Sequence, residues 1–202
     1  MHLVTQAARA LAEAHDRGIV HRDVKPENLF VTTAGGEGDF VKVLDFGIAR
    51  PADDASNLTR TGLVAGTTST MSPEVIRGAA ATPASDVYGL GVVLYHTLTG
   101  ASPFAGESIT VAAHLEEPVV PPSVRAPQPL PADLEAIVLR CLAKEPAERF
   151  SDGRALADAL ARSSLAGRWT PAAAEADRPR APSVPPSGSD AATRVAARRR
   201  AG

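Results

Sequence analysis

Residues 86–98, DVYGLGVVLYHTL, form a nearly continuous apolar stretch in the middle of the chain. The stretch is shorter than the run of about 18 apolar residues that a membrane span needs, and it is longer than most strands. We therefore predict a helix that is buried in the core of the protein.

The composition is that of an ordinary soluble globular protein, with 44% hydrophobic and 22% charged residues among the 202. The 21 Lys and Arg against 23 Asp and Glu leave a net charge of -2, which indicates neither a nucleic acid nor a membrane as partner. The single cysteine, Cys141, excludes an internal disulfide, and its apolar neighbours predict a buried thiol. We find no signal peptide and no run long enough to span a membrane, so we expect a cytoplasmic protein.

Three other segments space their apolar residues at helical intervals, and a helix is predicted for each of them: 2–16, 133–142 and 152–163. Two short runs have the character of strands instead, Leu29–Val31 and Phe40–Leu44. They flank the sequence TTAGGEGD, which we interpret as the loop of a β-hairpin. The chain is therefore predicted to be mainly helical, with one small hairpin.

Two further stretches lack the spacing of regular structure. Residues 47–72 are polar and rich in threonine and glycine, and a loop of this length in a compact domain is usually functional or disordered. Residues 164–202 are rich in proline and arginine and poor in large apolar side chains, so we interpret them as a disordered tail. The folded part is therefore expected within residues 1–163.

Polar side chains gather at the two ends of the predicted hairpin. Asp23 and Asn28 precede its first strand and Asp45 follows its second, so antiparallel pairing would bring them together. Two carboxylates and a carboxamide are oxygen ligands that suit Mg²⁺ bound together with a phosphate-bearing substrate. Lys25 lies among them, and its ammonium group would offset charge on a phosphoryl group during transfer.

The segment HRDVKPEN at 21–28, followed by DFG at 45–47, resembles the catalytic and metal-binding segments of the eukaryotic-like protein kinases. Further segments stand in that family's order: GTTSTMSPE at 66–74, SDVYGLGVVLYHTLTG at 85–100, SPF at 102–104 and KEPAERF at 144–150. The wording of these segments, with VKPEN and the compact SPF, is most similar to that of the bacterial serine/threonine kinases. The resemblance implies an α+β protein-kinase-like fold, in which residues 1–163 form the mainly helical C-terminal lobe with its small β-hairpin.

The same resemblance implies roles for the residues around the hairpin. Asp23 would be the catalytic base that orients the substrate hydroxyl, and Lys25 would contact the γ-phosphate of ATP. Asn28 and Asp45 would hold Mg²⁺ and, with Lys25, the nucleotide. The implied cofactors are ATP and Mg²⁺, and the implied reaction is transfer of the γ-phosphate to serine or threonine hydroxyls of protein substrates.

Other residues would regulate this site by the same resemblance. Arg22 would pair with a phosphorylated residue of the activation loop, a charge-assisted bond for which Thr59 and Thr61 are the candidate phosphosites. Thr67 would help to form the floor on which the substrate binds and would bond to Asp23 or Lys25.

Three residues would have structural roles. Glu74 and Arg149 would form a buried ion pair, and Asp86 would brace the backbone of the catalytic loop from the start of the central helix. His21, although it precedes the catalytic segment directly, would be a packing residue rather than a base.

A complete kinase carries further parts upstream of these segments: a Gly-rich loop over the phosphates, a lysine in a V-A-I-K strand and a helix glutamate. Here the matching segments begin directly after the first predicted helix, so we expect the N-terminal lobe to be absent and the isolated chain to have negligible kinase activity. Two explanations stay open. The chain is a truncated reading of an ordinary kinase gene, or it is a non-catalytic interaction module that docks partners, for example by completing another kinase chain.

Some patterns in the sequence indicate no ligand. GGEG at 35–38 is followed by a strand, and GLG at 89–91 lies in the apolar helix, where glycine permits close packing, so neither is interpreted as a phosphate-binding loop. The remaining histidines have no spacing typical of a metal site, and no role is predicted for them: His2, His15, His96 and His114.

Overall fold

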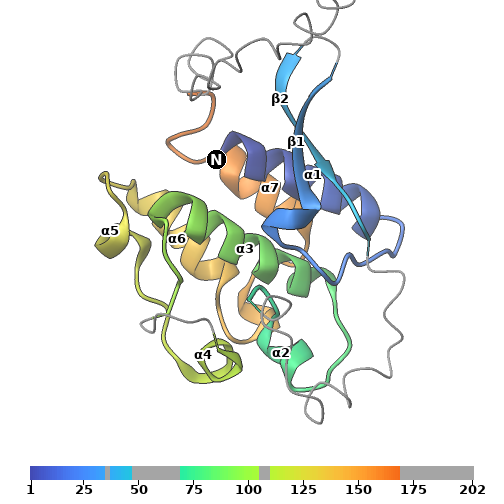
Figure 1. The fold of residues 1–202 in the computed structure, drawn as a ribbon, viewed down its shortest axis with the longest axis vertical. Helices are drawn as coiled ribbons and strands as arrows, with labels where there is room; N and C mark the ends of the chain where they lie inside the picture. The colour runs from blue at the N-terminus through green and yellow to red at the C-terminus, as the bar shows by residue number, and fades with distance from the viewer. Residues whose placement is uncertain (35–36, 47–68, 105–109, 169–202) are drawn as a thin grey trace, which may run out of the picture. The chain divides into compact units, whose positions relative to one another are not determined.

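The computed structural model describes residues 1–34, 37–46, 69–104 and 110–168. These residues form a set of helices and one two-stranded sheet, as Figure 1 shows. The predicted architecture, mainly helical with a single hairpin, is confirmed for this part of the chain. The long elements follow one another as α1 (His2–His15), β1 (Leu29–Ala34), β2 (Glu37–Val43), α3 (Pro83–Thr99), α6 (Ala132–Cys141) and α7 (Gly153–Ala161).

Helix α3 is the core helix that the apolar stretch predicts, and its residues from Ala84 to Tyr95 are all buried. It begins three residues before Asp86 because Thr82 and Ser85 form a capping box and a proline occupies the first turn. It ends at Gly100, whose φ of 67° suits glycine. Among the described residues, no helix combines the length and the apolar character that crossing a membrane requires.

Helices α1, α6 and α7 pack against α3 (Figure 1). Each of them turns an apolar stripe inward, and the buried side chains, among them Leu11, Leu134 and Leu156, form one cluster with those of α3. Helix α7 lies especially close to α1. A Cβ atom at Gly153 would come within 2.7 Å of the backbone nitrogen of Ala12, so only glycine allows this approach.

The two glycines of GLG permit close packing, as predicted. A Cβ atom at Gly91 would lie 2.5 Å from the Cβ of Cys141 on α6, and one at Gly89 would lie 3.0 Å from the carbonyl oxygen of Val24. Cys141 is buried, and this burial raises the pKa of its thiol to about 12. The thiol therefore stays protonated in the core, in agreement with the sequence-based expectation.

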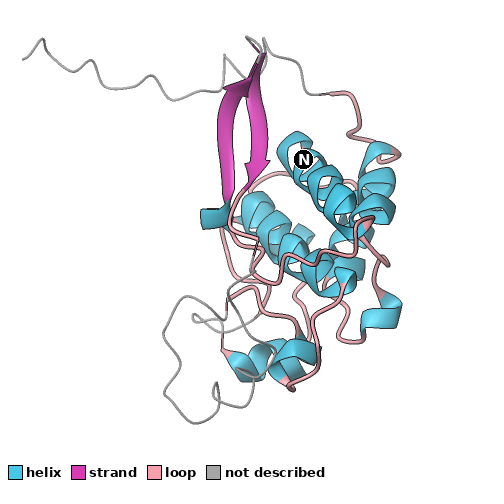
Figure 2. Cartoon of the chain, turned by 90° about the vertical axis from the view of Figure 1, so that its right-hand side faces the viewer, coloured by secondary structure: helices cyan, strands magenta, loops and turns pink. Residues whose placement is uncertain are grey.

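Strands β1 and β2 pair antiparallel, with Leu29 opposite Val43 and Val31 opposite Val41. The strands are longer than predicted, because residues of TTAGGEGD continue the ladder and only residues 35–36 separate the two strands. Gln6 on α1 fixes β2 in place. Its side-chain oxygen accepts from the backbone nitrogen of Val41 at 3.1 Å, and its nitrogen donates to the carbonyl of Asp39 at 2.8 Å. Figure 2 shows this hairpin at the edge of the helical part.

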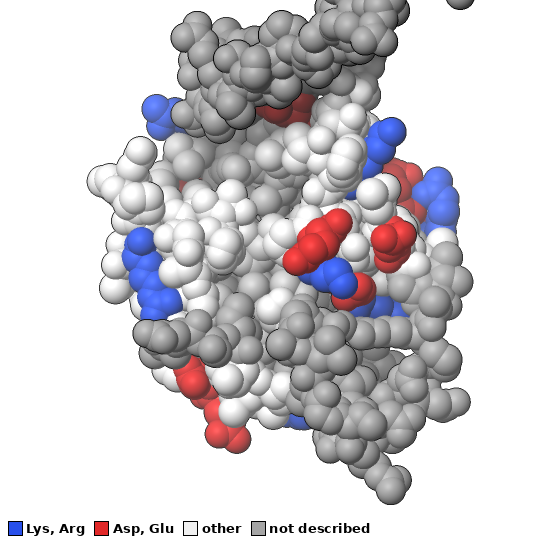
Figure 3. Space-filling model, viewed as in Figure 1, with Lys and Arg blue, Asp and Glu red and all other residues white. Residues whose placement is uncertain are grey.

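Short elements connect the long ones: η1 (Pro26–Asn28), α2 (Pro73–Ile76), α4 (Val111–Glu116), α5 (Pro122–Arg125) and η3 (Pro146–Glu148). All but α4 carry a proline in the first turn, where its missing N–H is not needed. Helix α4 begins instead with a cap in which the Thr110 hydroxyl accepts from the backbone nitrogen of Ala113. On the face drawn in Figure 3, acidic and basic side chains of the described residues are interspersed among uncharged ones.

Candidate functional site

The segment 21–28 leaves the end of α1, crosses the start of α3 and enters β1 through the short turn η1. Its backbone is held by one side chain, that of Asp86 in the first turn of α3. Asp86 Oδ2 accepts from the backbone nitrogen of His21 at 2.7 Å, and Oδ1 accepts from that of Arg22 at 2.8 Å. Arg22 has a φ of 69°, which is unfavourable for a residue with a side chain, so these two bonds stabilise a strained turn.

His21 is fully buried and connects the segment to the end of the hairpin. Its Nδ1 accepts from the backbone nitrogen of Asp23 at 3.3 Å, and its Nε2 lies 2.9 Å from the carbonyl oxygen of Leu44. Because Nδ1 accepts, the proton of the neutral ring sits on Nε2 and is donated to that carbonyl. The ring also packs against Phe46, with 4.7 Å between the ring centroids. Both ring nitrogens face backbone groups, as expected for a packing residue.

Asp23, Lys25 and Asn28 form a compact polar cluster before β1. Lys25 Nζ lies 2.7 Å from Asp23 Oδ2, and the two side chains are each 22% exposed. The amide nitrogen of Asn28 donates to the carbonyl oxygen of Asp23 at 2.8 Å and approaches Asp23 Oδ2 at 3.2 Å. The contacts from Lys25 and Asn28 converge on Oδ2 and fix the orientation of the carboxylate, and among the described residues Oδ1 accepts no hydrogen bond.

Asp45 lies two residues after the end of β2. The backbone nitrogen of Leu44 donates to the carbonyl oxygen of Asn28 at 2.9 Å and extends the ladder beyond the last strand pair. Asp45 is exposed and has a φ of 53°. The structure therefore brings Asn28 and Asp45 to the same end of the hairpin, as the antiparallel pairing predicts.

The donor set at this end of the hairpin fits a hard divalent cation. The amide nitrogen of Asn28 is used by Asp23, so its oxygen is the atom with which this side chain would bind a metal, and Asp45 adds a carboxylate. The described residues contain no group of three or more His, Cys, Asp or Glu side chains that could enclose a metal ion. A site with few protein oxygens suits Mg²⁺, which keeps water or phosphate oxygens as its other ligands.

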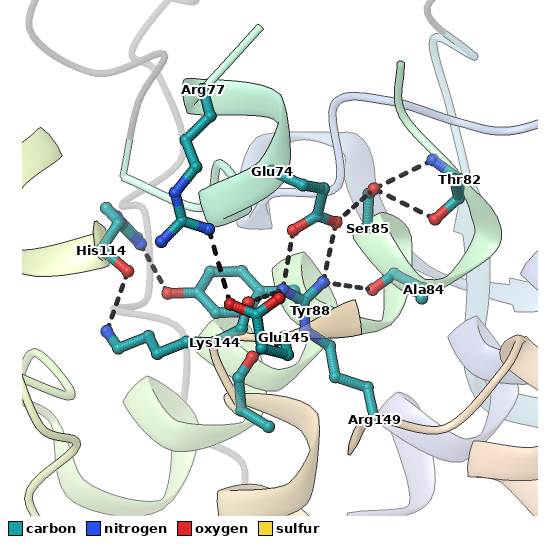
Figure 4. Close-up of polar contacts among 11 residues, drawn as sticks. Glu74, Arg77, Thr82, Ala84, Ser85, Tyr88, His114, Lys144, Glu145 and Arg149 are labelled. Carbon is teal, nitrogen blue, oxygen red and sulfur yellow. Dashed lines mark hydrogen bonds and ion pairs between the residues drawn. The ribbon is translucent and has the colours of Figure 1, made fainter. Parts of the chain in front are cut away.

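A second buried cluster joins α2 to the segment after α6, and Figure 4 shows it. Arg149 binds Glu74 through two hydrogen bonds of 2.8 and 2.7 Å, and the guanidinium also donates to the carbonyl oxygens of Ala84, Ala143 and Lys144. Ser85 donates to Glu74 at 2.7 Å. Burial alone would raise the pKa of Glu74, but the bonds from Arg149 and Ser85 hold it below its ordinary value. The pair is therefore ionised and saturated with partners.

His114, to which the sequence assigns no role, is fully buried beside this pair. The Tyr88 hydroxyl lies 2.8 Å from His114 Nδ1, and Lys144 Nζ donates to the carbonyl oxygen of His114 (Figure 4). Lys144 Nζ also donates to the carbonyl oxygen of Ala113. Burial, together with the charge of Lys144, lowers the pKa of His114 to about 4. Burial also lowers the pKa of Lys144 to about 8. The two residues anchor the short helix α4 to the core.

His15 is the other histidine that sequence reasoning left without a role. Its Nε2 lies 2.9 Å from Asp86 Oδ2, and its Nδ1 accepts from the backbone nitrogen of Gly153 at 3.1 Å. Asp86 and Gly153 are far from His15 in sequence, so no local spacing could reveal these contacts.

Thr59, Thr61 and Thr67 lie outside the described residues, as do Gly35 and Gly36 of GGEG. Arg22, whose predicted partner is a phosphorylated threonine of that loop, is exposed.

Comparisons with known proteins agree with this arrangement of elements. The family described as "protein kinase domain" matches residues 1–164. The serine/threonine-protein kinase PknA of Mycobacterium tuberculosis is 44% identical over 201 residues, which cover 98% of this chain and 44% of PknA. The serine/threonine-protein kinase pkn3 of Myxococcus xanthus is 44% identical over 161 residues, which cover 77% of this chain and 29% of pkn3.

A solved structure supports the same assignment. The crystal structure of a double mutant of the Mycobacterium tuberculosis PknI kinase domain superposes with a TM-score of 0.54 and 30% sequence identity. The alignment covers 79% of this chain and 51% of the PknI chain. The chain thus spans less than half the length of the two curated relatives and about half of the solved domain. The family match and the ordered site show that the chain belongs to the protein kinase family, among relatives that are bacterial serine/threonine kinases.

Proposed function

We propose that residues 21–46 form the metal-binding and base half of an ATP-dependent serine/threonine protein kinase site. The observation that carries the proposal is the position of four residues at one end of the hairpin: Asp23, Lys25, Asn28 and Asp45. Lys25 and Asn28 both contact the Asp23 carboxylate, and the backbone bond from Leu44 to Asn28 brings Asp45 to the same end of the hairpin.

Each residue has a role that its contacts support. Asp23, oriented by Lys25 and Asn28, would accept a hydrogen bond from the serine or threonine hydroxyl and take its proton as the phosphoryl group is transferred. Lys25, held 2.7 Å from that carboxylate, would place a positive charge beside the transferred group. Asn28 and Asp45 would hold Mg²⁺ with the phosphates of ATP, and the metal when bound neutralises charge on those phosphates.

Since the chain covers less than half the length of PknA, transfer is best measured on a chimaera in which the N-terminal part of PknA precedes residue 1. We expect the chimaera to transfer the γ-phosphate of ATP to serine or threonine of a protein substrate. Asp23→Asn should lower kcat by at least a hundredfold, and Arg154→Met, on an exposed side chain of α7, should leave it unchanged. A folded chimaera without transfer, or one in which Asp23→Asn is fully active, would contradict the proposal.

A second candidate function, a non-catalytic module that binds another kinase chain, is favoured by the apolar surface of the hairpin. Phe30 and Phe40 are 56% and 43% exposed. They lie on the opposite face of the hairpin from Val41, which is buried and bonded through its backbone to α1. A chimaera that binds ATP and Mg²⁺ but stays inactive, while the chain alone raises the activity of a second kinase, would favour this candidate.

A further inference from the structure

We propose that a small cavity between the candidate catalytic segment and residues 70–72 holds one ordered water molecule, through which Ser72 positions the two segments. The proposal rests on the proposed function, since the catalytic segment carries Asp23, and residues 70–72 follow Thr67, for which the kinase resemblance implies a place in the floor under the substrate. The lining of the cavity includes residues of both segments and of the start of α3.

The hydroxyl of Ser72 is a buried polar group in the lining of this cavity. Ser72 is 2% exposed, and its Oγ forms no hydrogen bond with any described residue. Ser72 is the N-cap of the short helix α2, but its side chain does not cap that helix, so the hydroxyl is available to another partner. A hydroxyl that is removed from water without a partner destabilises the fold, and buried polar groups in native proteins therefore bond to the protein or to an ordered water.

Two backbone carbonyl groups beside the cavity also lack a donor. The carbonyl oxygens of Val24 and Thr70 accept no hydrogen bond from a described residue, and both residues line the cavity. Both oxygens lie next to Gly89 of α3, since a Cβ atom there would be 3.0 Å from that of Val24 and 3.4 Å from that of Thr70. Because residue 89 is glycine, no side chain occupies the space beside these two oxygens.

One water molecule matches the size and the hydrogen-bonding groups of the cavity. Its free volume for a water-sized sphere is about 20 Å³, and a single water needs roughly 10–15 Å³ on this measure. Carbonyl oxygens only accept and a serine hydroxyl can donate, so the water would donate to Val24 and Thr70 and accept from Ser72. Three hydrogen bonds are the usual number for a buried water. The side chains of Asp86 and Ser85, which also line the cavity, are bonded to other groups.

The water would join two segments that have no direct hydrogen bond with each other. Among the residues that the structure describes, no hydrogen bond links residues 21–25 to residues 70–72. Val24 follows Asp23 directly in the chain, so a water that is bonded to Val24 and to residues 70–72 fixes the position of the candidate base relative to the substrate-binding segment. In this arrangement Ser72 does not touch the substrate, and it is a positioning residue that acts through the water.

The primary measurement counts bound water in the 202-residue chain and requires no activity. The ¹⁷O relaxation dispersion of water reports molecules that stay bound to the protein, and it is not affected by exchanging hydroxyl protons. Ser72→Ala should lower the number of bound waters by about one. The matched control is Ser163→Ala, which removes a buried hydroxyl that donates directly to the carbonyl oxygen of Leu160 and should leave the number unchanged. An unchanged number in Ser72→Ala would overturn the proposal.

The stability of Ser72→Ala distinguishes a filled cavity from a dry one. If the water is bound, the variant removes one of its three partners, and the equilibrium constant for unfolding should rise about fivefold in urea denaturation. If the cavity is dry, the variant removes a buried hydroxyl that has no partner, and the chain should be as stable as the native one or more stable. This second result would overturn the proposal.

A measurement on the unsubstituted chain covers the case in which a variant fails to fold. Nuclear Overhauser spectra that start from the water signal should show cross-peaks from a bound water to the protons of Gly89, beside which the two carbonyl oxygens lie. The absence of these cross-peaks would overturn the proposal.

Activity of the chimaera then tests the link to the substrate. Ser72→Ala should raise KM for the protein substrate about fivefold with little change in KM for ATP, whereas Ser163→Ala should change neither. If the unsubstituted chimaera is inactive, the proposed function fails, while the ¹⁷O measurement still decides whether the water is bound. If the chimaera is active and Ser72→Ala has the native KM for the protein substrate, the positioning role fails while the proposed function stands.

Discussion

At the scale of single residues, the protein stabilises charged groups by saturating them with partners. Arg149 is 2% exposed, and its guanidinium donates to Glu74 and to three backbone carbonyls, with its Cζ atom 4.8 Å from the ring centroid of Tyr88. Asp86 is 2% exposed and has three donors of its own. Removing one member of a buried ion pair leaves the other charge buried without its partner. This lowers the free energy of unfolding far more than the loss of an ion pair at the surface.

The ion pair of Arg149 and Glu74 gives a prediction at this scale. Arg149→Met should lower the free energy of unfolding by about 3–5 kcal/mol, because it leaves the buried Glu74 carboxylate with Ser85 as its only side-chain donor among the described residues and removes the donor to three carbonyl oxygens. Urea denaturation of the 202-residue chain measures this. The matched control is Arg154→Met, which removes the exposed ion pair with Asp16 and should change the free energy of unfolding far less. Equal losses in the two variants would show that the buried pair has no special weight.

At the scale of elements, the long helices form the core, whereas the short helix α4 is held in place by a few polar contacts. Helix α3 is buried along most of its length, and α1, α6 and α7 cover it. Helix α4 has only two turns, so it cannot be stable by itself. It depends on the bond between Tyr88 and His114 and on Lys144, which donates to two of its carbonyl oxygens.

Stability against pH tests the anchoring of α4. The pKa of His114 is about 4 in the folded chain and about 6.5 when unfolded, so between these values only the unfolded chain binds the proton. The free energy of unfolding should therefore fall as the pH falls through this window. Between pH 7 and 4.5 the native chain should lose about 2 kcal/mol more than His114→Gln, measured by urea denaturation at both pH values. Parallel losses in the two proteins would contradict the buried, neutral state of His114.

Most of the long elements could be predicted from sequence, because their apolar spacing reports which face is buried. The strands were predicted too short, since the polar residues at the tip of the hairpin pair through their backbones and give no apolar signal. The short helices α2, α4 and α5 were missed for a similar reason, as four to six residues are too few to show a helical period.

The site could be predicted in part. Residues 21–28 lie close together in sequence, and the hairpin explains why Asp45 joins them. The roles of His15 and His114 were missed because their partners are distant in sequence. His15 is 71 positions from Asp86 and 138 from Gly153 in sequence, and His114 is 26 positions from Tyr88. Only the packing of α1, α3, α4 and α7 makes these pairs neighbours.

At the scale of the whole molecule, the buried helix and the candidate site form one structure. The middle of helix α3 lies in the core, and Asp86 in its first turn accepts hydrogen bonds from the backbone of residues 21 and 22. Helix α1 leads into that segment, and His15 near its end connects α7 to the same carboxylate. Substitutions that loosen the packing of α1, α3 or α7 should therefore also disturb the position of Asp23, although that residue is not part of the core.

We propose that the hairpin end formed by Asn28 and Asp45 binds a divalent cation together with nucleotide phosphates. The most direct test follows Mn²⁺, a paramagnetic substitute for Mg²⁺, by NMR of the 202-residue chain in the presence of ATP. We predict that backbone signals of residues 23–29 and 44–46 broaden first, that Asp45→Ala abolishes this broadening, and that Asp158→Asn, an exposed acid on α7, leaves it intact. Broadening that persists unchanged in Asp45→Ala, or that centres on another part of the chain, would contradict the account.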